Sequence, residues 1–426
     1  MTTLRYLTAG ESHGKALVGI LEGMPSGLFL SSSDIDNDLL RRQGGHGRGA
    51  RMKIESDHAE ILSGVRWGKT IGSPITLLIE NKDYKNWLEG MSPDPEAEGS
   101  IPPVVNPRPG HADLPGAIKY GHHDMRNVLE RSSARETAAR VALGAVAKKF
   151  LSEFNITIGS YVLQIGEIRV QGPGGQRAKR PKGSARTLES LNPEILASMS
   201  EKAEKSPVRC PDEETSKKMV SLIDRVMKDG NSLGGVFEVF VAGLPAGLGS
   251  HVQWDRRIDG RLAQALTSIH AIKGIEIGLG FEMGKRFGSE VMDEIFYASP
   301  CHLLTKRGIG GSNVSTGIAT GFYRKTNNAG GVEGGMTNGM PVILRACMKP
   351  IPTLRKALRS VDIVTKKPVQ AAYERSDICA VPAAGVVGEA MVALTVADAF
   401  LEKFGGDTVS EVKRNYESYI GYINNF

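Results

Sequence analysis

The stretch RSSARETAARVALGAVAKKFL, residues 131–151, predicts a helix, and the segment that follows it indicates the fold class. Ser133 and Glu136 have the spacing of a capping box, which satisfies free backbone N–H groups at the start of a helix. Four apolar residues then recur at helical spacing: Ala138, Val141, Ala142 and Ala145. Residues 156–170 (ITIGSYVLQIGEIRV) alternate in part between apolar and polar side chains, which predicts a strand directly after the helix.

Further helices and strands lie on both sides of this unit. Helices are expected at 212–229, 256–271 and 389–404, and strands at 75–79 and 236–241. Because helices and strands are mixed without the regular β-α-β alternation of a doubly wound sheet, the sequence predicts the α+β class. No Gly/Ser-rich or Pro-rich linker divides the chain, so we expect a single domain over residues 1–426.

Three polar segments are expected to be mobile surface loops. Residues 92–103 are acidic and Pro-rich, and residues 172–184 are basic and rich in Gly and Pro. Residues 41–53 (RRQGGHGRGARMK) carry five Arg or Lys, one His and no acidic residue. Arginine binds carboxylates and phosphates with two hydrogen bonds, and glycines let several guanidinium groups converge on one anion. The third loop is therefore a candidate clamp for a polyanionic small molecule; a nucleic-acid segment and a solvated basic loop are the alternatives.

The composition is that of an ordinary globular protein, with 40% hydrophobic and 23% charged residues in a chain of 426. The formal net charge of +6 fits an enzyme for acidic metabolites or a nucleic-acid binder, and it does not separate the two. The four cysteines, at 210, 301, 347 and 379, form no CxxC pair. This spacing argues against a zinc site or redox dithiol and suits a reducing cytosol.

The N-terminal residues MTTLRYLT lack the apolar core of a signal peptide. No apolar run approaches the ~18 residues that a membrane span needs. We therefore expect a cytoplasmic protein that has no membrane partner.

Two short segments place a histidine beside a glycine turn: GESHG at 10–14 and RPGHAD at 108–113. Glycine permits a sharp turn that presents the imidazole to a cleft, and histidine is the natural general acid near neutral pH. For His13, an exposed loop histidine is the alternative. A metal site that uses the adjacent His122 and His123 is conceivable, but neighbouring histidines rarely reach one ion, so no metal is expected.

Three other segments could carry chemistry. RSSAR at 131–135 combines free helix-start N–H groups with hydroxyls and guanidinium groups, which makes an anion site; plain capping by serine is compatible with it. KPIPT at 349–353 is a stiff, extended segment. Arg375 and Asp377 would share one face of an extended chain, either as functional groups or as a simple surface ion pair.

Two glycine-containing segments exclude common nucleotide sites. The Gly-rich stretch 308–339 implies backbone packed closely against something flat or crowded. It lacks GxGxxG in a strand–helix context, so no dinucleotide site is predicted. GVRWGKT at 64–70 is one residue short of a P-loop, which argues against kinases and ATPases.

Taken together and in this order, the motifs resemble those of the chorismate synthase family. The matching blocks cover nearly the whole chain: GESHG at 10–14, RRQGGHGRG at 41–49, RPGHAD at 108–113, RSSARETAAR at 131–140, GGVEGGMTNG at 330–339, KPIPT at 349–353 and RSD at 375–377. The resemblance implies a β-α-β sandwich, a homotetramer, and conversion of 5-enolpyruvylshikimate 3-phosphate to chorismate by 1,4-elimination of phosphate. In the family this reaction needs reduced FMN, although it involves no net redox change.

The resemblance also implies roles for individual residues. His13 would donate a proton near the leaving phosphate, His111 would protonate or polarise the reduced flavin, and Asp377 would assist proton removal at flavin N5. The implied substrate contacts are Arg42, Arg48, Arg51 and Arg135. The implied FMN contacts are Arg131, Ser132, Ser133, His270, Ala271, Gly334, Lys349, Pro350, Ile351, Pro352, Thr353 and Arg375. The contact at residues 270–271 is expected to be made through the backbone.

Some members of the family reduce their own flavin with NADPH. Because no dinucleotide site is recognisable, we expect this protein to depend on an external flavin reductase. Two other functions stay open at this point. One is a flavin oxidoreductase on a similar scaffold, which would consume NAD(P)H; the other is an RNA-binding protein that uses residues 41–53 and 172–184. The lack of aromatic stacking motifs argues against RNA, so no nucleic-acid partner is expected.

Overall fold

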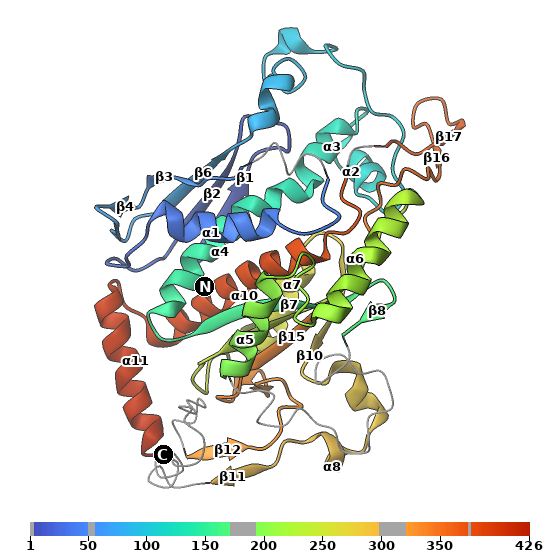
Figure 1. Cartoon of the computed structure of the whole chain (residues 1–426). Coiled ribbons are helices and arrows are strands. Elements are labelled where there is room, and N and C mark those ends of the chain that lie inside the picture. The colour runs from blue at the N-terminus through green and yellow to red at the C-terminus, as the bar shows by residue number, and fades with distance from the viewer. Residues whose placement is uncertain (1–3, 50–55, 171–192, 298–320, 374–375) are drawn as a thin grey trace.

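The computed structural model describes residues 4–49, 56–170, 193–297, 321–373 and 376–426, which build two antiparallel sheets with a layer of helices between them (Figure 1). The expected loop at 172–184, Cys301, residues 308–320 of the Gly-rich stretch, and the expected site residues Arg51 and Arg375 lie outside these ranges. The arrangement is a β-α-β sandwich, so the α+β class is confirmed.

The first sheet has the strand order β1-β2-β6-β3. Its strands are β1 (Arg5–Ala9), β2 (Ala16–Glu22), β6 (Ile75–Glu80) and β3 (Glu60–Ser63). Side chains alternate across a strand, so the buried residues of β2 and β6 all face the helix layer: Leu17, Leu21, Ile75, Leu77 and Ile79. The backbone of β2 lies close to that layer, because a Cβ at Gly19 would be 3.0 Å from the side chain of Leu143.

The second sheet has the strand order β10-β15-β9-β7-β8. Its strands are β10 (Ile272–Ile277), β15 (Val342–Met348), β9 (Gly235–Ala242), β7 (Thr157–Ile165) and β8 (Ile168–Arg169). One face packs on the central helices through Phe237 and Val239. The opposite face carries Tyr161 and Phe240, which helix α5 (Pro193–Glu204) covers with Leu196. This sheet is therefore buried on both faces.

The central layer contains α1 (Ser32–Gln43), α4 (Thr137–Ser152) and α10 (Val381–Phe404). Helices α4 and α10 touch at backbone distance, since a Cβ at Gly144 would lie 2.3 Å from the Cβ of Ala390. Helix α10 is long and apolar enough to cross a membrane, which the sequence analysis overlooked. Its most apolar 18-residue window is 94% buried inside the molecule, so α10 forms the core of the sandwich.

The remaining elements surround these layers. The helical ones are η2 (Lys82–Asn86), η3 (Pro95–Ala97), α2 (Asp113–Tyr120), α3 (Arg126–Ser132), η4 (Ala134–Glu136), α6 (Glu213–Lys228), η6 (Trp254–Arg256), α7 (Ile258–Thr267), η7 (Gly280–Lys285), α8 (Gly288–Val291) and α11 (Val409–Asn424). The short strands are β4 (Val65–Arg66), β5 (Lys69–Thr70), β11 (Ile295–Tyr297), β12 (Phe322–Arg324), β13 (Val332–Glu333), β14 (Met336–Thr337), β16 (Arg359–Val361) and β17 (Pro368–Gln370).

Most expected elements are present, with three differences in detail. The capping box is wrong: Ser133 caps the 3-10 turn η4 by accepting from the N–H of Arg135, but the Glu136 carboxylate binds Arg140 and Thr8 instead. Helix α10 begins at Val381 rather than at Glu389. The expected strand at 156–170 is interrupted by a turn that separates β7 from β8.

Two further segments bear on the sequence analysis. GVRWGKT at 64–70 is the hairpin of β4 and β5, whose turn residues Trp67 and Gly68 have φ values of 52° and 73°. This left-handed pair is typical of two-residue hairpin turns and does not form a P-loop. Residues 92–103 lie on the surface and contain only the turn η3.

A buried ion network joins the helices of the central layer to the second sheet. Its centre is Glu389 of α10, which accepts hydrogen bonds from Arg41 (2.7 and 2.8 Å), Lys148 (2.9 Å), Arg209 (3.2 Å) and Ser160 (2.7 Å). Burial acts to raise the pKa of Glu389, but the charges of Lys148 and Arg41 outweigh it and hold that pKa below its usual range. The carboxylate is therefore ionised in the folded protein.

Replacing Glu389 with glutamine is expected to lower the free energy of unfolding by roughly 3–5 kcal/mol near pH 7, because it leaves buried cations without their counter-charge. The Glu389 pKa is depressed by folding, so its contribution is present above the unfolded pKa of about 4.5 and is lost as pH falls. Urea unfolding at several pH values should show the gap between wild type and variant shrinking in acid. A gap that does not change with pH would contradict this assignment.

Candidate active site

His13 lies in the loop between β1 and β2 and is held from several sides. Its backbone N–H donates to Glu130 Oε2 (2.7 Å), and its ring Nδ1 lies 2.8 Å from Glu130 Oε1. The ring stacks on Trp87 with centroids 4.3 Å apart. Its Nε2 is 4.0 Å from an Asp83 carboxylate oxygen. The side chain is 15% exposed, so His13 is not the exposed loop histidine of the alternative interpretation.

Two arginines expected to bind substrate meet at a buried aspartate. Arg42 lies at the end of α1 and Arg135 in η4. Asp57 accepts from Arg135 Nη1 (2.5 Å) and from Arg42 Nη2 (3.2 Å), and its side chain is fully buried. Asn81 accepts from Arg135 Nε (2.8 Å), which fixes the plane of the guanidinium group.

The local charge around Asp57 is positive. Burial lowers the pKa of Arg42 to about 10, and the neighbouring charges of Arg135 and Arg48 add to this shift against the opposing effect of Asp57. Three arginines therefore face two carboxylates, Asp57 and Asp377. An added anion would relieve this excess charge, which is the electrostatic requirement of a site for a polyanion.

Arg48 and Asp377 connect the glycine loop to the segment before α10. Arg48 Nη1 lies 2.6 Å from Asp377 Oδ2, and the backbone N–H of Gly49 donates to Oδ1 (2.6 Å). The loop backbone also runs beside this segment, because Ile378 N–H donates to the Gly47 carbonyl (2.8 Å). Asp377 is thus held by two donors from one loop.

Arg41 does not join the anion clamp that its motif suggests. It points to Glu389 in the buried ion network, on a different side of α1 from Arg42. Consecutive helical residues differ in direction by about 100°, so both side chains cannot reach one ligand. The prediction that the arginines of 41–53 converge is therefore wrong for Arg41, and Arg51 lies outside the described residues.

His111 belongs to a second histidine–carboxylate pair. Its Nδ1 is hydrogen-bonded to Asp113 Oδ1, and Arg108 Nε donates to Asp113 Oδ2 (2.9 Å). Arg108 Nη1 also donates to the hydroxyl of Thr353 (3.0 Å). Burial acts to raise the pKa of Asp113, but the hydrogen bond from His111 and the charge of Arg108 lower it well below its usual range. Asp113 is therefore an anion that fixes the His111 ring.

The KPIPT segment, residues 349–353, connects the His111–Asp113 pair to the segment that carries Asp377. Lys349 donates its backbone N–H to the Ala271 carbonyl (2.9 Å) and its Nζ to the Gly110 carbonyl. At the other end, the Thr353 carbonyl accepts from the hydroxyl of Ser376, the residue before Asp377 (3.2 Å). Pro350, Ile351 and Pro352 lie between these anchors. The segment thus runs from the His111 turn to the segment before α10 that carries Asp377.

The expected FMN contacts include two buried polar atoms that have no hydrogen-bond partner in the described part of the chain. They are the Oγ of Ser132 and the Nδ1 of His270. Burial lowers the pKa of His270; Glu136 opposes this effect, and the charges of Arg140 and His111 add to it. Buried polar atoms are normally hydrogen-bonded, so two orphans among expected ligand contacts fit a bound polar molecule. Ala271 follows with φ +65°, a strained value outside glycine.

Arg131, Ser133 and Gly334 complete the expected contacts. Arg131 donates to the carbonyls of Thr8 (2.8 Å) and Gly10 (3.1 Å), while the Ser133 hydroxyl lies 3.1 Å from that of Ser12. Both residues therefore hold the His13 loop. Gly334 forms the turn between β13 and β14, where an added Cβ would meet open space. Among the described residues, none of the hydrogen bonds given above for the site involves Gly334.

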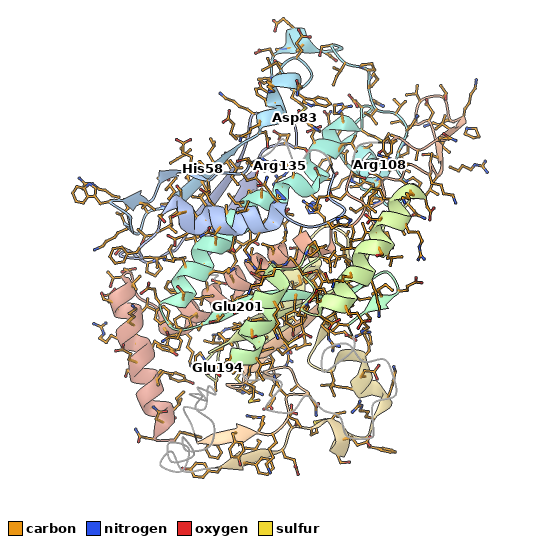
Figure 2. All side chains as sticks on the ribbon, in the orientation of Figure 1. His58, Asp83, Arg108, Arg135, Glu194 and Glu201 are labelled. Carbon is orange, nitrogen blue, oxygen red and sulfur yellow. The ribbon has the colours of Figure 1, made fainter. Side chains whose placement is uncertain are left out.

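Figure 2 labels Arg135 and Arg108 in the upper part of the molecule, beside α3. Asp57 links Arg135 to Arg42, and separate contacts link Ser376, next to Asp377, through Thr353 to Arg108. The two groups act on each other through charge, because Arg48 and Asp377 both affect the pKa of Arg42. Sequence analysis missed Asp57, Asn81, Trp87 and Glu130, which hold these groups. Among the residues that hold these groups, only Arg108 and Asp113 could be found from the sequence, because they are the first and last residues of the RPGHAD motif. Within the described residues there is no group of three or more His, Cys, Asp or Glu side chains that could hold a metal ion.

Buried arginines beside two histidine–carboxylate pairs define the site of an enzyme that acts on an anionic small molecule. A family model described as "Chorismate synthase" matches residues 4–401. The chain belongs to the chorismate synthase family.

Similar proteins match this chain along nearly its whole length. The chain is 56% identical over 423 residues to a chorismate synthase of Aquifex aeolicus, covering 99% of each chain. It is 54% identical to one of Geobacter metallireducens, covering 99% of this chain and all of the relative. A solved structure titled "Crystal Structure of Chorismate Synthase" matches with a TM-score of 0.76 and 48% identity over 99% of both chains. This match confirms the expected β-α-β sandwich of the chorismate synthase type.

Proposed function

We propose that this protein catalyses the 1,4-elimination of phosphate from 5-enolpyruvylshikimate 3-phosphate to give chorismate, the carbon–oxygen lyase reaction of its family. The observation that carries the proposal is the Asp57-bridged pair of buried arginines, which Asn81 ties to the His13 loop by accepting from Arg135 and donating to the carbonyls of Glu11 and Gly14. The substrate has a phosphate and two carboxylates. A site with an excess of buried guanidinium groups matches those anions. The proposed reaction is the last common step in the biosynthesis of the aromatic amino acids.

The leaving phosphate is assigned to the His13 side of the site. His13 Nε2 transfers a proton to the departing oxygen, which removes the need to expel a fully charged anion. Arg42, Arg48 and Arg135 bind the substrate anions and stabilise the charge that develops as the carbon–oxygen bond breaks. Because these groups are buried and already oriented by carboxylates, little reorganisation accompanies the reaction.

We assign the FMN site to the surface formed by Ser132, His270 and the KPIPT segment. The orphaned Ser132 and His270 atoms support this assignment, because a flavin offers polar edges for both. When bound, reduced FMN supplies electron chemistry that no side chain can provide. His111 holds a proton on the ring nitrogen that does not face Asp113. Asp377, paired with Arg48, is the acceptor for a proton at this end of the site.

The finer biological context follows from the family resemblance. We propose a cytoplasmic homotetramer that receives reduced FMN from an external flavin reductase. No recognisable dinucleotide motif occurs in the sequence, which supports the need for that partner. We propose no nucleic-acid or membrane partner, since the arginines of the glycine loop that the structure describes are engaged by carboxylates.

Anaerobic assay with chemically reduced FMN tests the proposal. Added 5-enolpyruvylshikimate 3-phosphate should release one phosphate for each chorismate formed, with no net oxidation of FMN. Absence of phosphate release under these conditions would refute the lyase. NADPH consumed in proportion to product would instead indicate an oxidoreductase. Steeply salt-dependent RNA binding at assay concentrations would favour the nucleic-acid alternative.

A companion reaction tests the reductase prediction. With NADPH and oxidised FMN alone, we expect no sustained turnover, and adding a flavin reductase should restore it. Sustained turnover with NADPH and no added reductase would show that the protein reduces its own flavin.

A further inference from the structure

Glu130 binds the His13 loop through both its side chain and its backbone. Its Oε1 lies 2.8 Å from His13 Nδ1, and its Oε2 accepts the backbone N–H of the same residue at 2.7 Å. Its backbone carbonyl accepts the N–H of Ser12 (2.9 Å). The Glu130 side chain is 4% exposed. Both carboxylate oxygens thus contact one residue that lies far away in the sequence.

Asp83 and Arg126 also lie around the His13 ring. Asp83 of η2 is 4.0 Å from Nε2 and is labelled in Figure 2 above α3. Arg126 of α3 lies 3.8 Å from Glu130 Oε1 and stacks 4.9 Å from the Trp87 ring centre. Trp87 covers one face of the imidazole. The ring therefore has a fixed plane, with Nδ1 directed at a carboxylate and Nε2 on the opposite edge.

We propose that Glu130 is a positioning residue for the reaction, and that it holds His13 with a proton on Nδ1 so that Nε2 serves the leaving phosphate. This inference rests on the proposed function. An ionised carboxylate accepts hydrogen bonds and cannot donate one, so it selects the Nδ1–H form of the ring. In the step itself, Nε2 of the imidazolium gives its proton to the phosphate oxygen as the carbon–oxygen bond breaks. The ring is left neutral, with Nδ1–H on Glu130, and regains a proton from solvent.

Glu130→Gln separates this role from simple anchoring of the loop. The amide oxygen can still accept the backbone N–H of His13, and the backbone contact to Ser12 is unchanged. The amide NH₂ then faces Nδ1 as a donor, which favours the other tautomer and disfavours the imidazolium. Glu130→Asp keeps the charge at a shorter reach. Glu153→Gln is the matched control, because Glu153 pairs with Lys413 away from this site.

A double-mutant cycle with His13→Ala tests the coupling, with kcat measured anaerobically with reduced FMN. In the wild-type background, Glu130→Gln should lower kcat by roughly 10²-fold, with KM changed by less than about 3-fold. In the His13→Ala background, the same substitution should change kcat by less than about 3-fold. Equal losses in both backgrounds, or no loss in either, would overturn the proposal. Glu130→Asp should recover part of the activity, and Glu153→Gln should match wild type.

A spectroscopic measurement keeps the inference separate from the proposed function. Nitrogen-15 NMR of histidine-labelled protein, assigned with His13→Ala, should show a protonated Nδ1 for His13 in the wild type and Glu130→Asp. Glu130→Gln should lose that signature. An unprotonated Nδ1 in the wild type at neutral pH would overturn the proposal even if the enzyme is active. An inactive wild type with the expected signature would refute the lyase assignment and leave the Glu130–His13 coupling intact.

Discussion

Replacing His111 with alanine is expected to lower kcat by roughly 10²- to 10⁴-fold, the contribution typical of a positioned acid or base. The ring is partly exposed and is oriented by Asp113, which Arg108 in turn holds. Little apolar contact is lost with the imidazole, so the fold should be retained. The measurement is anaerobic turnover with reduced FMN, accompanied by thermal unfolding of the same preparation.

His58 provides the matched control for this prediction. It also pairs with an aspartate, since its Nδ1 is 2.7 Å from Asp36 Oδ2 of α1, but it is exposed. Figure 2 labels it well apart from Arg108, which binds the His111 turn. His58→Ala should leave kcat unchanged. A His111→Ala enzyme with near wild-type turnover would remove His111 from the mechanism.

Replacing Arg42 with alanine is expected to weaken binding of 5-enolpyruvylshikimate 3-phosphate by roughly 10²-fold or more, because truncating a buried charged partner typically costs 2–5 kcal/mol. Arg42 is buried and bound to Asp57, and its pKa is lowered by burial and further by the charges of Arg135 and Arg48. Calorimetric titration of substrate into protein with oxidised FMN measures the effect without turnover.

The neighbouring Arg41 gives the sharpest comparison. Arg41→Ala should lower the melting temperature, because it leaves Glu389 short of a counter-charge, while the folded variant keeps its substrate affinity. Opposite phenotypes are therefore expected from adjacent residues of one motif. Equal loss of affinity in both variants would contradict the division of roles between the two arginines.

Periodicity predicted the helices and strands whose pattern is local. The stripe from Ala138 to Ala145 faces the core in α4, and Ile75, Leu77 and Ile79 form the buried face of β6. The first two turns of α10 were missed because VPAAGVVG, residues 381–388, contains Pro and Gly, which usually interrupt helices. Here the proline lies in the first turn, where it is tolerated. The glycines allow close packing, since a Cβ at Gly388 would lie 2.7 Å from the Phe237 ring.

The candidate site was predictable where its residues share a motif and not where partners come from distant segments. His111 and Asp113 stand two residues apart, whereas Glu130 and Asp57 meet His13 and Arg135 across 117 and 78 positions. A lone Glu or Asp in such a position has no local pattern. The capping-box error has a local cause and a distant one, because Arg140, one helical turn along the chain, and Thr8, 128 positions away, both bind the Glu136 carboxylate.

We propose that one site places the substrate phosphate beside His13 and the flavin beside His111 and Asp377. A crystal structure of the protein with FMN and 5-enolpyruvylshikimate 3-phosphate tests it most directly. We expect the phosphate within hydrogen-bonding distance of His13 and the arginines, and the flavin in contact with Ser132, His270 and the KPIPT segment. Flavin bound elsewhere, or substrate bound away from Arg42 and Arg135, would contradict the account.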